Sequence, residues 1–130
     1  MGVSGTWLND QPETEIVYII LEGNWTWDDF FQFVDQHLDP MLLTIDKRKG
    51  CVICDMTKSP RLPMDAITQA TRLIRRGTHW DLTVVVGSNA FAKMLVNVIT
   101  RLLPNLAKNV ATAETLEQAI TLIETHRAQD

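Results

Sequence analysis

The chain has 130 residues, of which 45% are hydrophobic, and its formal net charge is −4. This length predicts a single domain over residues 1–130, and the apolar fraction argues against a disordered chain. The mild negative charge gives no support for nucleic-acid binding. No apolar run approaches the ~20 residues of a membrane span, and residues 1–9 lack the basic and apolar parts of a signal peptide. We therefore expect a cytoplasmic protein with no membrane span.

The N-terminal part of the chain predicts two strands and a helix. Residues 3–9 are expected to form a short edge strand. The β-branched run over residues 15–21 is typical of a strand that is buried on both faces. Thr26 has the side chain of a helix N-cap, and the apolar spacing after it predicts a helix over residues 27–38. We expect Asp39-Pro40 to interrupt this helix, because proline lacks a backbone N–H.

The middle of the chain predicts one strand–loop–helix–strand crossover. An apolar run begins at Cys51 and ends in Asp55, and a polar loop bracketed by prolines follows. A helix is expected over residues 64–76 and a second strand over residues 82–86. Units of this kind build parallel sheets that are covered by helices, and their ligands gather at the carboxyl ends of the strands.

The C-terminal part predicts two more helices and a strand. Residues 89–103 have helical spacing and precede a proline, and residues 109–111 form a short strand. The sequence Thr115-Leu-Glu-Gln118 is a capping box that opens a helix to about residue 126. The complete order predicts an α/β fold: a small sandwich with a mostly parallel sheet of four or five strands and about four helices.

This pattern resembles the STAS family, which includes the anti-sigma-factor antagonists and the tails of sulfate transporters. The resemblance lies in the following four segments: the strand Ile16–Leu21 with Glu22-Gly23, the strand Val52–Asp55, the run Leu82–Gly87, and the closing strand and helix over Asn109–Ile123. It implies a STAS-like sandwich and a noncatalytic regulatory or protein-interaction domain. The partner that it implies is a protein such as an anti-sigma-type kinase or regulator.

The family's regulatory switch is a phosphorylated Ser or Thr in a turn that opens the second helix. Asp65 matches the family's turn, but the acceptor position falls on Ala66. Phosphorylation would therefore have to use another hydroxyl, and the nearest ones are Thr57, Ser59 and Thr68. A phosphate there would add roughly −1.5 to −2 charges and would disrupt or create a contact.

The loop after the middle strand is the expected partner-binding surface, because functional residues concentrate on loops of this kind. The predicted partner-binding residues are Asp55, Thr57, Lys58, Ser59, Arg61 and Asp65. Two other interpretations stay open. The loop is equally consistent with a solvated connector, and Asp55 with a cap on its own loop.

The helix over residues 89–103 has a broader apolar arc than a surface helix needs. Its expected apolar interface or pocket consists of Phe91, Met94, Leu95 and Val98. Four interpretations stay open for this arc: a deep core, a homodimer interface, contact with a membrane, and a pocket for an apolar or anionic-apolar small molecule. The last would make the protein a ligand-binding module, with its pocket between the helices over residues 64–76 and 89–103. Two interpretations stay open for Trp25 and Trp27: they line a pocket mouth, or Trp25 staples the start of its helix.

The remaining reactive residues predict no catalytic, metal or cofactor site. Cys51 and Cys54 lie three residues apart in one strand, so we expect buried side chains on opposite faces of the sheet. His37, His79 and His126 are scattered and have no predicted partners. No nucleophile–base pattern or metal-ligand spacing stands out, and an enzyme is not expected.

Overall fold

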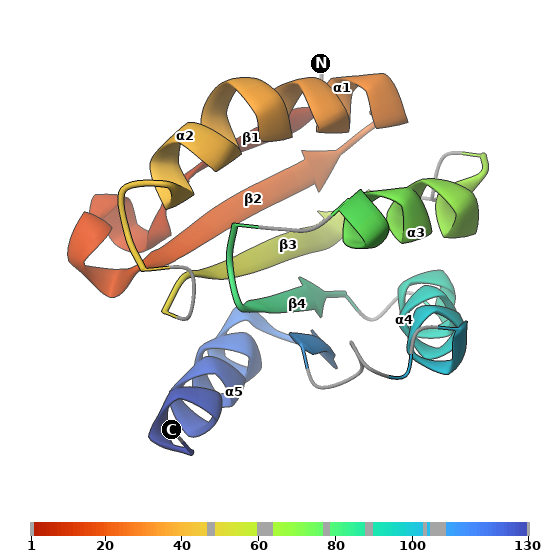
Figure 1. The fold of residues 1–130 in the computed structure, drawn as a ribbon. Coiled ribbons are helices and arrows are strands. Elements are labelled where there is room, and N and C mark those ends of the chain that lie inside the picture. Colours follow the sequence, from red (N-terminus) through yellow and green to blue (C-terminus); the bar gives the residue numbers. More distant parts are fainter. Residues whose placement is uncertain are drawn as a thin grey trace.

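A computed structural model describes residues 2–46, 49–59, 64–76, 79–87, 90–102, 104 and 109–129. The chain forms a five-stranded sheet in the order β1-β2-β3-β4-β5 (Figure 1). The strands are β1 (Val3–Trp7), β2 (Ile16–Glu22), β3 (Cys51–Lys58), β4 (Leu82–Val86) and β5 (Val110–Ala113). β1 pairs antiparallel with β2, and the other neighbours are parallel. The predicted α/β fold with a mostly parallel sheet is confirmed.

Helical segments connect the parallel strands and follow the last one. They are α1 (Trp27–Phe33), the π-helical turn η3 (Val34–Leu38), α2 (Asp39–Leu42), α3 (Ala66–Arg76), α4 (Ala90–Leu102) and α5 (Leu116–Ala128). Two short 3-10 turns, η1 (Leu8–Asp10) and η2 (Pro12–Thr14), join β1 to β2. The expected break at Asp39-Pro40 is wrong, because the chain stays helical from α1 through α2.

A π-turn explains how this helix accommodates proline. The backbone N–H of Asp39 donates to the carbonyl of Val34, five residues earlier, so the turn before Pro40 is wider than an α-turn. Pro40 follows this turn directly as the second residue of α2, and it donates no backbone hydrogen bond back to it. At the other end, Thr26 and Asp29 form the predicted N-cap as a capping box, with two reciprocal hydrogen bonds of 3.1 Å.

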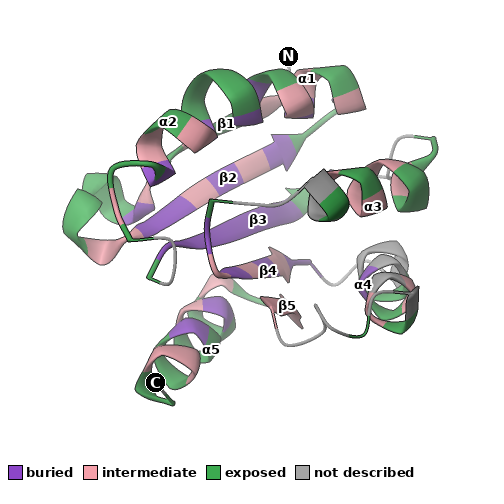
Figure 2. Cartoon of the chain, in the orientation of Figure 1, coloured by how far each residue is buried: buried purple, intermediate pink, exposed green. Residues whose placement is uncertain are grey.

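Both faces of the sheet are buried, and different helices pack against each face. Val17, Val52 and Cys54 point to the face that packs against α1, η3 and α2, which we call the helical face. Cys51 and Ile53 point to the opposite face, under α5, which we call the α5 face. Figure 2 shows the buried residues concentrated in the central strands, as the continuous apolar runs predict.

The three crossovers have the same hand. Each connects a strand to its next neighbour in the same direction along the sheet. Side chains of α1, α3 and α4 all meet the helical face, where Phe30, Leu73 and Val96 lie over the strands. A common face and a common direction require one handedness, and right-handed crossovers are the rule. Among the described α-helices, α5, which follows the last strand, covers the other face.

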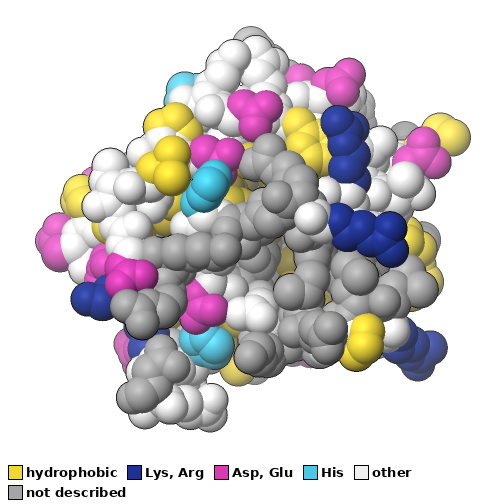
Figure 3. Space-filling model, viewed as in Figure 1, with side chains coloured by type: hydrophobic (Ala, Val, Ile, Leu, Met, Phe, Trp, Pro, Cys, Tyr) yellow, Lys and Arg dark blue, Asp and Glu magenta, His cyan; other side chains and the backbone are white. Residues whose placement is uncertain are grey.

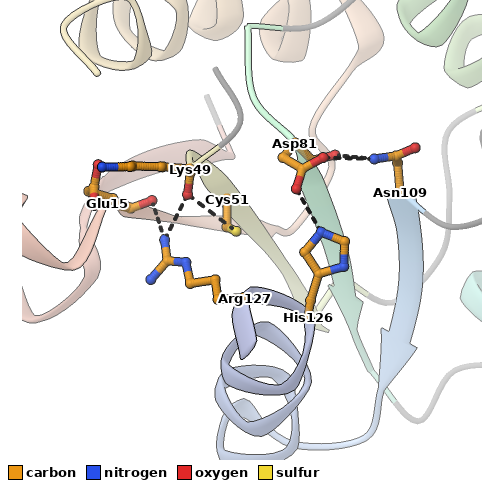
Figure 4. A network of polar contacts seen from close by, with 7 residues as sticks. All are labelled: Glu15, Lys49, Cys51, Asp81, Asn109, His126 and Arg127. Carbon is orange, nitrogen blue, oxygen red and sulfur yellow. Dashed lines mark hydrogen bonds and ion pairs between the residues drawn. The ribbon is translucent and has the colours of Figure 1, made fainter. Parts of the chain in front are cut away.

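α5 is fastened to the amino ends of the parallel strands (Figure 4). His126 Nε2 lies 2.6 Å from Asp81 Oδ2, and Asn109 Nδ2 donates to Asp81 Oδ1 at 2.9 Å. Arg127 donates to the carbonyls of Thr14, Glu15 and Lys49 at 2.9, 3.1 and 2.9 Å. These side chains satisfy backbone carbonyls where β2 and β3 begin, and they set the position of α5 on the sheet.

Of two adjacent leucines at the end of α2, one faces the core and the other faces solvent. Leu42 is fully buried, whereas Leu43 is 64% exposed. We expect Leu42→Ala to lower the free energy of unfolding by about 2–5 kcal/mol, and Leu43→Ala to change it by less than about 0.5 kcal/mol. Urea unfolding followed by tryptophan fluorescence measures both values. Equal losses in the two variants would contradict this helical register.

Candidate functional site

Asp55 anchors the carboxyl end of β3, where the sequence predicts the partner-binding loop. Its carboxylate accepts a hydrogen bond from the Tyr18 hydroxyl on β2. The other carboxylate oxygen accepts from the Thr57 hydroxyl at 2.6 Å and from the Thr57 backbone N–H at 2.9 Å. Asp55 is buried and caps the chain that follows it, one of the two interpretations that the sequence left open.

The electrostatics of this cluster favour one protonation pattern at neutral pH. Burial and the hydrogen bond to Asp55 raise the pKa of Tyr18 to about 12. Burial also acts to raise the pKa of Asp55, but hydrogen bonds from Thr57 and Tyr18 and the charge of Lys58 outweigh it, so the pKa is lowered. Tyr18 therefore stays protonated and Asp55 stays ionised, and the pair links β2 to β3 as a fixed donor and acceptor.

Ser59 lies on the interior side of the same strand end. Its side chain is only 5% exposed, and its hydroxyl accepts a hydrogen bond of 3.0 Å from Trp25 Nε1. Trp25 also contacts Trp27 edge-on, with ring centroids 4.9 Å apart, just before α1. This bond links the entry of α1 to the end of β3. A kinase could not reach Ser59 unless this region opened, whereas Thr57 and Thr68 are exposed.

The predicted partner-binding residues do not form one patch. Asp55 accepts hydrogen bonds from Thr57 and from Tyr18, and Tyr18 packs against the α5-face core, whereas α3 covers the helical face. Lys58 and Asp65 are exposed, and Asp65 has a left-handed backbone with φ of 63°. Arg61 lies outside the described residues.

The start of α3 exposes large apolar side chains. Met64 is 86% exposed and Ile67 is 38% exposed. Thr68, Arg72 and Arg75 are also exposed. We call these five residues the α3 surface. Residues 68, 72 and 75 share one helical face by spacing, Ile67 flanks it, and Met64 lies in the turn just before the helix. Figure 3 shows positively charged side chains over α3.

Among the described side chains of α4, Val96 points inward. It is buried and lines an apolar cavity on the helical face. Of the residues that the sequence indicated, Met94 is 48% exposed and Val98 is half-buried. The side chains of Phe91 and Leu95 lie outside the described residues. The homodimer through residues 89–103 stays a prediction.

The two cysteines are buried free thiols on opposite faces, as the strand alternation predicts. Burial raises the pKa of Cys54 to about 12 and also raises the pKa of Cys51. His126, for which the sequence indicated no partner, lies against Asp81. Within the described ranges, no three His, Cys, Asp or Glu side chains gather closely enough to hold a metal ion.

Comparison with protein-family models, with curated proteins and with solved structures gave no match for this chain. The resemblance to STAS domains therefore stays a prediction from the sequence pattern. None of the helices in the described part of the chain is both long and apolar enough to span a bilayer.

Tyr18 is the only tyrosine, so its titration can be followed directly by phenolate absorbance. Its folded pKa of about 12 lies above the ordinary value of 10.0. Protonated Tyr18 therefore stabilises the fold fully below about pH 10, and this stabilisation is lost as the pH rises toward 12. We expect Asp55→Asn to lower the pKa of Tyr18, because the variant removes the nearby negative charge.

Asp28→Asn, at an exposed position in α1, is the matched control for this titration. It should leave the pKa of Tyr18 unchanged. A wild-type pKa near 10, or equal values in Asp55→Asn and wild type, would show that Asp55 does not hold the Tyr18 proton.

The bond between Trp25 and Ser59 gives a stability prediction. Ser59→Ala would leave the buried indole N–H of Trp25 without this acceptor, so we expect a loss of about 1–3 kcal/mol in the free energy of unfolding. Ser4→Ala, at an exposed position in β1, should change it by less than about 0.5 kcal/mol. Chemical denaturation measures both. If Ser59→Ala lowers the free energy of unfolding no more than Ser4→Ala does, the bond between Trp25 and Ser59 does not stabilise the contact between α1 and β3.

Proposed function

We propose that this chain is a noncatalytic protein-interaction domain of the STAS-like kind and that a protein partner docks on the α3 surface. The observation that carries the proposal is the exposure of Met64 and Ile67, which leaves two large apolar side chains in water at the start of one helix. Exposed apolar side chains rimmed by charge are typical of protein interaction sites.

The charge of the α3 surface indicates the chemistry of the partner. Arg72 and Arg75 are exposed, and residues 66–76 contain no acidic side chain. Arg72 is also held over the Phe31 ring, with its guanidinium carbon 5.1 Å from the ring centroid. The whole chain carries a net charge of −4, so this positive face is local. We therefore expect the partner to present an apolar patch with acidic neighbours.

Thr68 is the hydroxyl that best suits a phosphorylation switch on this surface. Thr57 already donates its hydroxyl to Asp55, and Ser59 is buried. Thr68 is exposed in the first turn of α3, one turn before Arg72. A phosphate on Thr68 would be favoured by the helix N-terminus and would offset the positive charge that attracts an acidic partner. Phosphorylation would then release the partner.

The test is to replace the exposed apolar residues and to follow one partner quantitatively. We expect Met64→Glu and Ile67→Glu to weaken the binding of that partner at least about tenfold, because each places a charge in a desolvated contact. Leu43→Glu is the matched control, since Leu43 is 64% exposed and lies at the end of α2 instead. The partner is first captured by the tagged wild-type chain and is then titrated as a purified protein against each variant.

Three outcomes would contradict the proposal. One is a partner that binds both variants at α3 as tightly as it binds wild type. In another, the capture experiment gives the same set of proteins for the wild-type chain and for Met64→Glu. If Leu43→Glu weakens binding as much as the α3 variants do, the interaction surface lies elsewhere.

A further inference from the structure

An apolar cavity lies between the sheet and the helices α1, α3 and α4, and we propose that it binds a small, uncharged, apolar ligand. Its volume is about 110 Å³. This is smaller than an apolar protein cavity of ~150 Å³ that holds benzene, but the cavity is partly open to solvent. A short alkyl chain therefore fits inside it, and an aromatic ring fits with part of the ligand projecting from the opening. This proposal goes beyond the docking function and does not depend on it.

The small side chain of Ala70 leaves room for the cavity. α3 lies over the helical face of the sheet, beside α4. Ala70 and Leu73 of α3 face the strands across this space. Ala70 is too small to fill it. Val85 and Val110, which point to the helical face, consequently remain half-buried.

The residues that line the cavity disfavour a charged ligand. The described residues that line the cavity include Trp25, Trp27, Trp80 and Phe30 and carry no ionisable group other than the thiol of Cys54. That thiol stays neutral, because burial raises its pKa to about 12. A charged ligand would lose its hydration here without an ion pair in return.

The hydrogen-bonding groups in the walls are largely occupied. Trp25 Nε1 donates to Ser59, and Trp80 Nε1 donates to Thr83 Oγ1 at 2.8 Å. Among the described lining residues, Trp27 Nε1 is the buried side-chain nitrogen without a partner. A ligand with one hydrogen-bond acceptor would satisfy this donor, whereas a strongly polar ligand would find no further partners.

This site is separate from the α3 surface. Ala70 and Leu73 lie on the inward side of α3, Thr68 and Arg75 are exposed on its outward side, and Met64 is exposed in the turn before it. Variants of the inward side therefore test the cavity alone, and failure of this proposal leaves the docking proposal intact.

Toluene is the probe, and benzoate is its charged counterpart of similar shape. We expect toluene to raise the melting temperature of the wild-type chain in a saturable way and to shift the indole N–H resonances of the lining tryptophans. Benzoate at the same concentrations should do neither. Ala70→Phe should weaken toluene binding at least about tenfold, because the new ring occupies the cavity. Ala66→Phe, on the same helix but outside the lining, should stay within about twofold of wild type.

Val96→Phe fills the cavity from α4 and keeps the test decisive if Ala70→Phe fails to fold. Circular dichroism establishes that each variant is folded before binding is measured. The absence of a saturable toluene response in the wild-type chain would overturn the proposal. So would toluene binding that both filled variants retain, or benzoate binding as tight as that of toluene.

Discussion

The order of the strands determines which face of the sheet each helix can cover. β2, β3, β4 and β5 follow one another in sequence and in space, and neighbouring pairs are parallel. Three crossovers of one hand then place α1–α2, α3 and α4 on the same face. The other face is left to α5, the helix that no later strand constrains. Tyr18 and Ile20 of β2 are half-buried on that face, beyond the strands that α5 covers.

This distribution of helices explains both the tightly packed and the loosely packed parts of the molecule. The continuous segment from α1 to α2 buries Val34, Leu38 and Leu42 completely against the first strands. α3 and α4 share the remaining width of the helical face, where an apolar space stays open beneath α3. α5 packs alone, and its last turn depends on polar ties from His126 and Arg127 to the amino ends of the strands. Both proposed functions use α3, the outer side for a partner and the inner side for a ligand.

The sequence predicts the strands and the faces of their side chains well, because β-branched runs and alternation are local signals. The opposite placement of Cys51 and Cys54 follows from a spacing of three residues. The passage of the helix through Pro40 could not be predicted, because it depends on a π-turn that no local pattern specifies. The partners of Asp55, Ser59 and Asp81 are Tyr18, Trp25 and His126, which are 37, 34 and 45 residues away along the chain. Apolar residues cover a broad arc of α4, so their spacing alone does not identify Val96 as a residue that points inward.

Three crossovers of one hand place α3 and α4 over the helical face, and an apolar cavity lies beneath them. A crystal structure determined under xenon pressure tests this claim most directly, because xenon enters dry apolar cavities and is located without ambiguity. The account predicts a xenon atom enclosed by Val52, Leu73 and Val96. A structure with no xenon on the helical face, and with Leu73 packed directly on Val52 and Val85, would contradict it.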